Sequence, residues 1–282
     1  MTENINYQFQ ELCGNGNLEE IKQFYFDNPT VDISANDEWA FRCACKNRHL
    51  KVAKWLLEVK PNIDISAYKD EAFRWTCHNG HLEVAKWLLE TKPDIKISVY
   101  KDEAFRWTCY NGHLEVAKWL LEIKPDINIF AVNKCVFIWT CEKGHLKVAK
   151  WLLEINPDID ISADNEEAFR WACAKGHLEV AKWLLETKPD INISANNAYA
   201  FYVACWYGNL NIAKWLLKIK PNINIYENNN YALIWSSLCR HLKIAKLLLQ
   251  HKTQKYYIFV KKNKICKKIK IYDKNEKIAK QI

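Results

Sequence analysis

Cysteine and histidine are the residues of this sequence whose chemistry could build a metal site, a disulfide or a nucleophile. Seven of the 11 cysteines recur every 32 residues: Cys13, Cys45, Cys77, Cys109, Cys141, Cys173 and Cys205. Four histidines recur at the same interval: His81, His113, His145 and His177. If the repeating units stack like packed helices, successive members stand about 8–10 Å apart. A disulfide needs Cα atoms within about 7 Å, and zinc needs ligands about 2.3 Å from one ion. We therefore expect no metal ion and no disulfide.

These residues fit a structural role better than a chemical one. We interpret the periodic cysteines as small apolar residues of a core, and the histidines as helix-start residues that bond nearby backbone. Reduced cysteines fit an intracellular compartment. The sequence contains no GxGxxG, GxxxxGK, HExxH or GxSxG motif. Because the carboxylates are also spread along the repeats with no candidate pair in a cleft, we expect neither an enzyme nor a bound cofactor.

The 32-residue interval defines the element that positions these side chains. The dipeptide His-Leu or Asn-Leu occurs once per interval, starting at Asn17, His49, His81, His113, His145, His177, Asn209 and His241. In one unit, the composition of residues 71–77 predicts a helix that stops before Gly80. Residues 81–90 place their leucines on one helical face, and Pro93 ends that helix. Two short helices cannot bury their apolar faces alone, so the repeats predict an α-solenoid.

The repeated motif also resembles a known family. Residues 80–89, with the sequence GHLEVAKWLL, resemble the second-helix signature of ankyrin repeats, and Ala172-Cys173 stands where the family has Ala-Ala. The resemblance covers residues 2 to about 257. Three first helices carry Glu-Ala-Phe-Arg in place of the family's Thr-Pro-Leu-His, and Lys-Pro replaces the Gly-Ala after the second helix. The Trp-rich variant is similar to the paralogous ankyrin proteins of giant amoeba-infecting DNA viruses (mimivirus type).

This resemblance implies an all-α, ankyrin-type helix-turn-helix solenoid of about eight 32-residue repeats. We expect an N-terminal capping repeat at 1–33, the ankyrin array at 34–257 and a Lys-rich C-terminal tail at 258–282. The implied function is non-enzymatic protein–protein interaction by a viral protein in a host cell, in the cytoplasm or the nucleus. We expect a monomer, and no membrane contact, because the longest apolar runs fall far short of the roughly 20 residues of a membrane helix.

In the ankyrin family, the hairpin tips and the concave side of the first helix contact targets. The matching positions here are Tyr68, Asp70, His78, Tyr100, Asp102, Tyr110, Lys134, Glu142, Asp164, Glu166, Asn196, Trp206, Asn228 and Asn230. We favour Tyr68, Tyr100, Tyr110 and Trp206, because aromatic anchors dominate binding hot spots. The alternative is neutral variation at solvated positions.

Tryptophan and arginine also form rows. Trp55, Trp87, Trp119, Trp151, Trp183 and Trp215 fall in second helices. We favour the interpretation that they seal one repeat against the next, and the alternative is a half-exposed strip that grips a partner. Arg42, Arg74, Arg106 and Arg170 fall beside a second tryptophan row, where stacking of cations on aromatic rings is expected.

The charge of +8 is unevenly distributed. Residues 251–282 hold 11 Lys against two acids, a net +9, and the remaining 30 basic and 31 acidic residues give −1. The basic cluster comprises Lys261, Lys262, Lys264, Lys267, Lys268 and Lys270. It predicts a soluble cap of the array, a nuclear import signal or a contact to nucleic acid, which would then bind through the tail alone. A third hypothesis is an adaptor for host ubiquitin machinery. Viral ankyrin proteins of that kind carry a C-terminal F-box-like segment, and residues 251–282 contain no convincing one.

Overall fold

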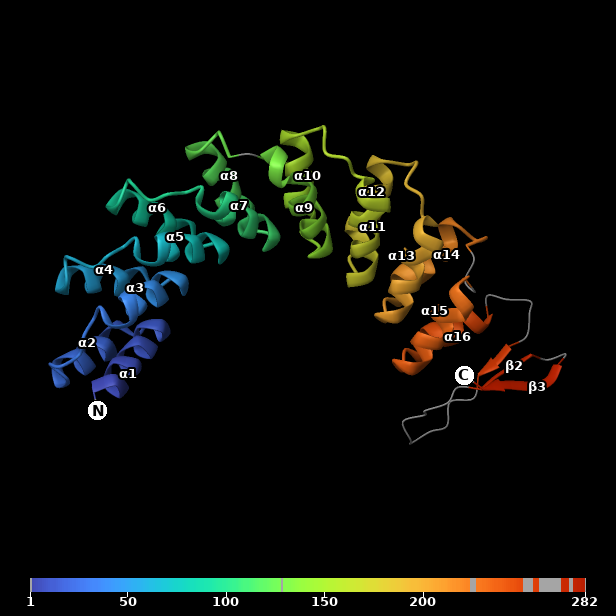
Figure 1. The fold of residues 1–282 in the computed structure, drawn as a ribbon, viewed down its shortest axis with the longest axis horizontal. Coiled ribbons are helices and arrows are strands. Elements are labelled where there is room, and N and C mark those ends of the chain that lie inside the picture. The colour runs from blue at the N-terminus through green and yellow to red at the C-terminus, as the bar shows by residue number, and fades with distance from the viewer. Residues whose placement is uncertain are drawn as a thin grey trace. The chain divides into compact units, whose positions relative to one another are not determined.

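The computed structural model describes residues 2–127, 129–223, 227–250, 256–258, 270–273 and 276–281. Within that part of the chain, sixteen helices precede three short strands (Figure 1). The helices are α1 (Thr2–Asn15), α2 (Leu18–Asp27), α3 (Ala35–Lys46), α4 (Leu50–Val59), α5 (Ala67–His78), α6 (Leu82–Thr91), α7 (Val99–Tyr110), α8 (Leu114–Ile123), α9 (Ile129–Glu142), α10 (Leu146–Ile155), α11 (Ala163–Lys175), α12 (Leu178–Thr187), α13 (Ala195–Trp206), α14 (Leu210–Ile219), α15 (Glu227–Leu238) and α16 (Leu242–Gln250). The predicted helix-turn-helix repeat is confirmed.

Each repeat pairs a first helix with a second helix across a tight turn. In the repeat that contains α5 and α6, the turn is Asn79-Gly80, and Gly80 adopts φ +77°. The second helix then buries Val84, Ala85 and Leu88 completely and leaves Glu83 exposed. The apolar spacing that predicted this helix is therefore the spacing of its buried face.

The chain forms two compact units, Met1–Val136 and Phe137–Ile282. In the first unit, α1, α3, α5 and α7 pack side by side in sequence order. In the second unit, α11, α13 and α15 do the same. A fully buried phenylalanine from each first helix except α15 forms the centre of the core, and α15 has Leu233 at this position. These phenylalanines are Phe9, Phe41, Phe73, Phe105, Phe137, Phe169 and Phe201.

The second-helix tryptophans pack across repeats. Trp87 lies against Phe41 of the preceding repeat, with ring centroids 6.2 Å apart, and Trp119 lies against Phe73 at the same distance. Trp183 and Trp215 contact Phe137 and Phe169 at 6.3 and 6.2 Å in the second unit. The interpretation that this row seals one repeat against the next is confirmed.

The periodic cysteines and histidines also serve the stack. All seven cysteines of the row are fully buried, and burial raises the pKa of thiols such as Cys77 and Cys173. The ring of His113 stands directly over Gly80 of the preceding repeat and bonds the backbone of His78. Both residue types therefore have the structural roles that the sequence indicated, with the histidine bonding the preceding repeat rather than its own.

One local feature was not predicted. First helices begin with a left-handed turn: Tyr68, Lys69 and Asp70 have φ values of 52°, 56° and 59°. Residues 36–38 and 164–166 repeat this geometry. Left-handed backbone costs an L-residue roughly 1–2 kcal/mol, so the turn needs compensation from its surroundings. Asn and Asp tolerate left-handed backbone best among residues with a side chain. The pairs Asn36-Asp37 and Asp164-Asn165 are therefore the sequence signal from which these turns could have been predicted.

Three strands follow the helices: β1 (Tyr256–Ile258), β2 (Lys270–Asp273) and β3 (Glu276–Gln281). They form an antiparallel sheet in the order β1-β2-β3, with Tyr257 opposite Tyr272 and Ile271 opposite Lys280. The all-helical prediction therefore holds for the repeats, and strands follow them. Of the predicted basic cluster, only Lys270 belongs to a strand; Lys261, Lys262, Lys264, Lys267 and Lys268 lie outside the described residues.

Candidate partner-binding surface

The left-handed turns and the first helices that follow them form one surface in each unit, which we call the first-helix face. In the first unit it is built by α3, α5 and α7, and in the second by α11, α13 and α15. Most of the sequence-predicted binding positions belong to these elements. An arginine near the middle of the first helix organises the face at α3 and α5, and α7 and α11 carry an arginine at the same position.

Arg42 shows how the arginine works. It is buried, and its guanidinium donates to the carbonyl oxygens of Asp37 and Asn36 at 2.9 Å each. The same group forms an ion pair with Glu71 of the next repeat and stacks on the ring of Tyr68, 4.4 Å from its centroid. The arginine thus compensates the left-handed turn and links two repeats through one planar group.

Arg74 repeats this arrangement one repeat further on. It donates to the carbonyl oxygens of Lys69 and Tyr68 at 3.0 Å each and pairs with Glu103. Its guanidinium lies 5.1 Å from the centroid of the Tyr100 ring. The predicted stacking of arginine on aromatic rings is confirmed. Arg42 and Arg74 thus each pair with the glutamate 29 residues later, which belongs to the next repeat.

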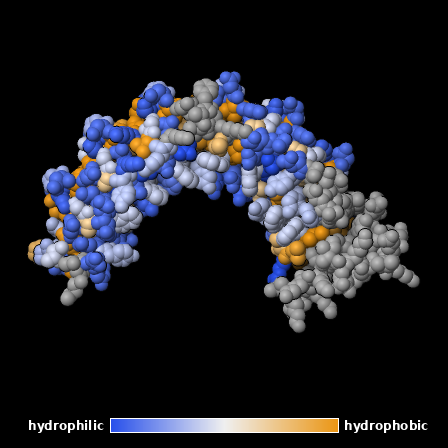
Figure 2. Space-filling view, viewed as in Figure 1, coloured by the Kyte–Doolittle hydropathy of each residue, from blue (hydrophilic) through white to orange (hydrophobic). Residues whose placement is uncertain are grey.

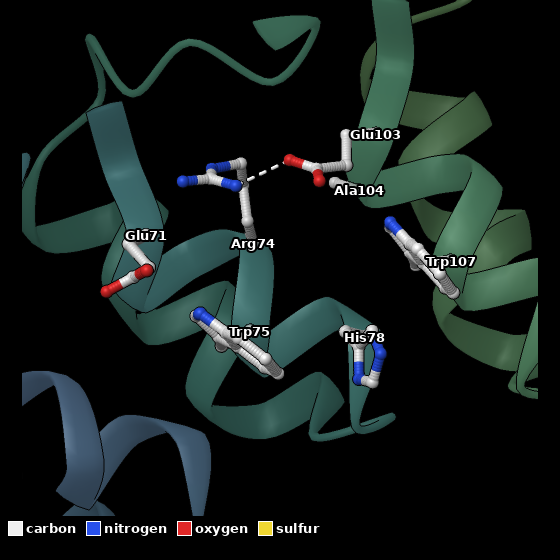
Figure 3. Close-up of a pocket in the computed structure, with 7 residues that line it drawn as sticks. All are labelled: Glu71, Arg74, Trp75, His78, Glu103, Ala104 and Trp107. Atoms are coloured by element: carbon white, nitrogen blue, oxygen red, sulfur yellow. Dashed lines mark hydrogen bonds and ion pairs between the residues drawn. The ribbon is translucent and has the colours of Figure 1, made fainter. Parts of the chain in front are cut away.

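A pocket of about 280 Å³ opens between α5 and α7. Its lining residues are Glu71, Arg74, Trp75, His78, Glu103, Ala104 and Trp107. Figure 3 shows the Arg74–Glu103 pair on one side of the pocket and the His78 ring on another, with the two indoles between them on neighbouring helices. The His78 ring centroid lies 5.1 Å from that of Trp75 and 5.4 Å from that of Trp107. The pocket is therefore a slot between two indoles.

Several predicted binding residues of the first unit lie around this slot. Tyr68 and Tyr100 are 58% and 50% exposed, and each stacks on an arginine that carries the adjoining ion pair. His78 lines the slot itself, and Tyr110 packs edge-on against Trp107 at 5.0 Å. The first unit therefore brings four of the predicted positions together. Trp107, 39% exposed, was not among them.

Three predicted acidic residues are buried. Asp70, Asp102 and Glu166 are 3%, 8% and 8% exposed. Asp70 accepts from the Ser66 hydroxyl at 2.7 Å and from the Lys96 amide at 3.2 Å, a contact that joins neighbouring repeats. Glu166 accepts from the backbone of the following repeat in the same way. Such carboxylates belong to the array, so we do not place them in a partner surface.

The second unit gathers a different set of side chains. Trp206 stacks on Trp235, with centroids 5.1 Å apart and planes 23° from parallel. Tyr202 contacts Trp206, Tyr199 and Tyr231 within 6.1 Å. Burial, with neighbouring tyrosines, raises the pKa of Tyr202. Of the predicted binding positions listed above, this aromatic cluster contains Trp206.

The other predicted positions of the second unit lie apart from the aromatic cluster or are not described. Asp164 and Asn196 are exposed, and Glu142 pairs with Lys175 at 3.6 Å. The side chains of Asn228 and Asn230, and of Lys134 in the first unit, lie outside the described residues. Figure 2 shows apolar surface over α15 and α16, where Leu238 and Leu242 are 44% and 61% exposed.

Two other kinds of feature are absent from the described part of the chain. No group of three or more His, Cys, Asp or Glu residues is placed there to hold a metal ion. No described helix is long and apolar enough to cross a membrane.

Comparison with known proteins agrees with this geometry. The family model described as "Ankyrin repeats (3 copies)" matches residues 9–100, 41–131, 105–197 and 169–259. The ankyrin repeat domain of human ASB11 is similar in structure, with a TM-score of 0.53 and 19% identity, over 75% of this chain and 97% of that one. No curated protein matches the sequence. Since the matched segments together span most of the sequence, the chain belongs to the ankyrin-repeat family.

Proposed function

We propose that this chain binds a partner protein through its first-helix face, with the anchors of the first unit on α5, α7 and the turns before them. Ankyrin repeats generally mediate protein–protein interaction. The observation that carries the proposal is the exposure of Tyr68 and Tyr100, each held over an arginine. Tyrosine and arginine are enriched among residues that dominate binding energy.

The contacts of these tyrosines make them suitable anchors. Arg42 and Arg74 are each fixed by two backbone carbonyls and an ion pair, so the rings that stack on them lose little freedom on binding. A preordered surface avoids part of the entropy cost of association. Because the surface is preordered, we expect the array to recognise its partner without a conformational change. We propose no catalytic role.

We also propose where in the cell this interaction takes place. On the resemblance of its sequence to viral ankyrin proteins, we propose that the chain acts in a host cell, in the cytoplasm, on a host protein. The net charge of +9 in residues 251–282 favours a second candidate function, contact with nucleic acid or nuclear import through that segment. The near-neutral repeats favour the protein partner.

A nuclease-treated pull-down from host-cell lysate, analysed by mass spectrometry, tests these proposals with the full chain as bait. The binding variant is the double substitution Tyr68→Ser and Tyr100→Ser. The matched control is Phe26→Ser, which alters an 81% exposed ring on a second helix. We expect the control to retain the specifically captured proteins and the double variant to lose them.

A third bait addresses the tail, with Lys261, Lys262, Lys267 and Lys268 replaced by Gln. If this variant loses the captured proteins and the tyrosine variant keeps them, the tail carries the interaction and the first-helix face does not. Circular dichroism of every bait must show the wild-type helix content, so that a loss of capture reports on binding rather than on folding.

A further inference from the structure

The slot between Trp75 and Trp107 differs from the equivalent place in the second unit. Residues 128 positions later are Val203 and Trp235, four repeats further along. There the residue that matches His78 is Trp206, and its indole stacks on Trp235 at 5.1 Å. The residues that match Glu71, Arg74 and Glu103 are Tyr199, Tyr202 and Tyr231, all in ring contact with one another through Tyr202. In the second unit, aromatic rings thus fill the space between first helices that corresponds to the slot.

In the first unit the corresponding space between α5 and α7 remains open. His78 is smaller than an indole, and a volume of about 280 Å³ remains beside it, between the indoles of Trp75 and Trp107. Figure 3 shows the two indoles on neighbouring helices with the His78 ring at one end of the slot. Offset stacking and edge-to-face contacts form at centroid distances of about 4.5–7 Å, so one further ring can contact both indoles.

The charges around the slot disfavour a charged occupant. Arg42 and Arg74 neutralise Glu71 and Glu103. Lys46 places its Nζ atom 4.3 Å from the centroid of the Trp75 ring and adds a positive charge. A cation entering the slot would meet a net positive surrounding. An anion would have to lie beside the Oε1 atoms of the two carboxylates, which the arginines do not engage. A neutral ring meets neither repulsion.

The hydrogen-bonding capacity of the slot favours a ring that carries a donor. Arg42 and Arg74 each engage the Oε2 atom of their glutamate, and no described residue donates to Oε1 of Glu71 or Glu103. The equivalent Glu167 accepts from the indole N–H of Trp171 at 3.1 Å, which shows that a glutamate at this position accepts such a bond. A partner indole or phenol could be held in the same way.

We propose that the slot between α5 and α7 binds one neutral aromatic side chain with a hydrogen-bond donor, a Trp or Tyr of the partner. This inference rests on the proposed function and names the group that the face recognises. The ring stacks between Trp75 and Trp107, and its N–H or O–H donates to Glu71 or Glu103. Tyr68 and Tyr100 lie beside it as the flanking contacts.

The test uses the full chain and N-acetyl-tryptophanamide as the probe, with N-acetyl-argininamide and N-acetyl-leucinamide for comparison. The indole N–H signals of Trp75 and Trp107 are followed by NMR and are assigned with Trp→Phe variants. We expect saturable shifts of these two signals with tryptophanamide and not with the other amides. The inference is overturned if tryptophanamide leaves them unchanged, or if argininamide shifts them at lower concentration.

The variant His78→Trp copies the filled slot of the second unit. It should fold with wild-type helix content, abolish the tryptophanamide shifts and weaken partner capture roughly tenfold or more, the loss expected of a hot-spot contact. The control Phe26→Ser alters an exposed ring on α2, outside the slot, and should retain the shifts. Probe binding that survives in His78→Trp also overturns the inference.

The two proposals fail separately. If His78→Trp loses the probe but keeps partner capture, the slot accepts a ring and the partner does not use it, which refutes the partner assignment of the slot. If Tyr68→Ser with Tyr100→Ser abolishes capture while the slot fails to bind the probe, the proposed function stands and the aromatic occupant is refuted.

Discussion

The contact between Gly80 and His113 allows a quantitative test of how the repeats stack. In the variant Gly80→Ala, the new residue must adopt φ +77°, which costs roughly 1–2 kcal/mol. Its Cβ would lie 2.3 Å from Nδ1 of His113, so the imidazole must move. The ring then loses its bond to the His78 backbone, worth about 1 kcal/mol. Reduced freedom of the unfolded chain offsets about 0.4–1 kcal/mol, and the net expected destabilisation is about 2 kcal/mol.

Gly14 provides the matched control. It lies in α1, has no positive φ, and a Cβ there would meet Asn47 at 3.5 Å, an ordinary contact. Since Gly weakens a helix relative to Ala by roughly 0.5–1 kcal/mol, Gly14→Ala should be neutral or slightly stabilising. The two variants make the same chemical change, and of the two only Gly80→Ala should lower the free energy of unfolding.

The assay is urea unfolding followed by circular dichroism, with the slope of the transition compared between variants. A double-mutant cycle with His113→Ala isolates the clash, because an alanine at 113 has no ring for the new Cβ to meet. We expect a coupling free energy of about 1 kcal/mol. If Gly80→Ala unfolds at the wild-type urea concentration, or if the cycle shows no coupling, the stacking of the imidazole on the glycine is refuted.

Three further predictions follow from the same contacts. Burial lowers the pKa of His113, as of His81 and His177, so the unfolded chain takes up protons first as pH falls through about 6.5 and stability is lost below that pH. The variant His113→Asn has the residue found at the equivalent position 209, and in urea titrations it should lose less stability than the wild type between pH 7.5 and 5.5. A loss equal to that of the wild type would show that protonation of His113 does not cause the effect. Labelling of native protein with a thiol reagent, read by peptide mass spectrometry, should modify exposed Cys135 and Cys239 long before the buried cysteine row, and equal rates would refute the core assignment. Arg42→Lys should destabilise by about 2 kcal/mol in urea unfolding, since an ammonium cannot reproduce the planar contacts of the guanidinium; a wild-type midpoint would show that these contacts contribute little.

The repeat, its helices and its core could be predicted from the sequence because they depend on local, periodic signals. Gly80 ends a helix through its own backbone freedom, and Leu88 is buried because of its spacing from Val84 and Ala85. Repetition made these signals reliable, since the same spacing recurs with little change from one repeat to the next. The cysteine row was predictable for the same reason.

The binding surface was less predictable because it depends on contacts between repeats. Asp70 looked like a variable surface acid, but the left-handed turn directs its carboxylate to the backbone of the next repeat. Glu71 stands three residues before Arg74 in its own helix, but it pairs with Arg42 of the preceding repeat. Spacing along one helix does not reveal a partner 29 residues away in sequence unless the stacking geometry is already known.

The residues equivalent to His78 show how one fold can offer different surfaces along its length. The first helices present Lys46, His78 and Tyr110 in the first unit and Trp206 in the second, each against a tryptophan. The phenylalanine core beneath them does not change, and the turn keeps a positive φ at Gly80, Gly112 and Gly208, with Arg48 at the same place after Lys46. Substitution at such a position therefore alters what the face can bind without altering how the repeats stack. That separation explains why the residues that specify the fold are periodic, and why recognition must be sought where the period is broken.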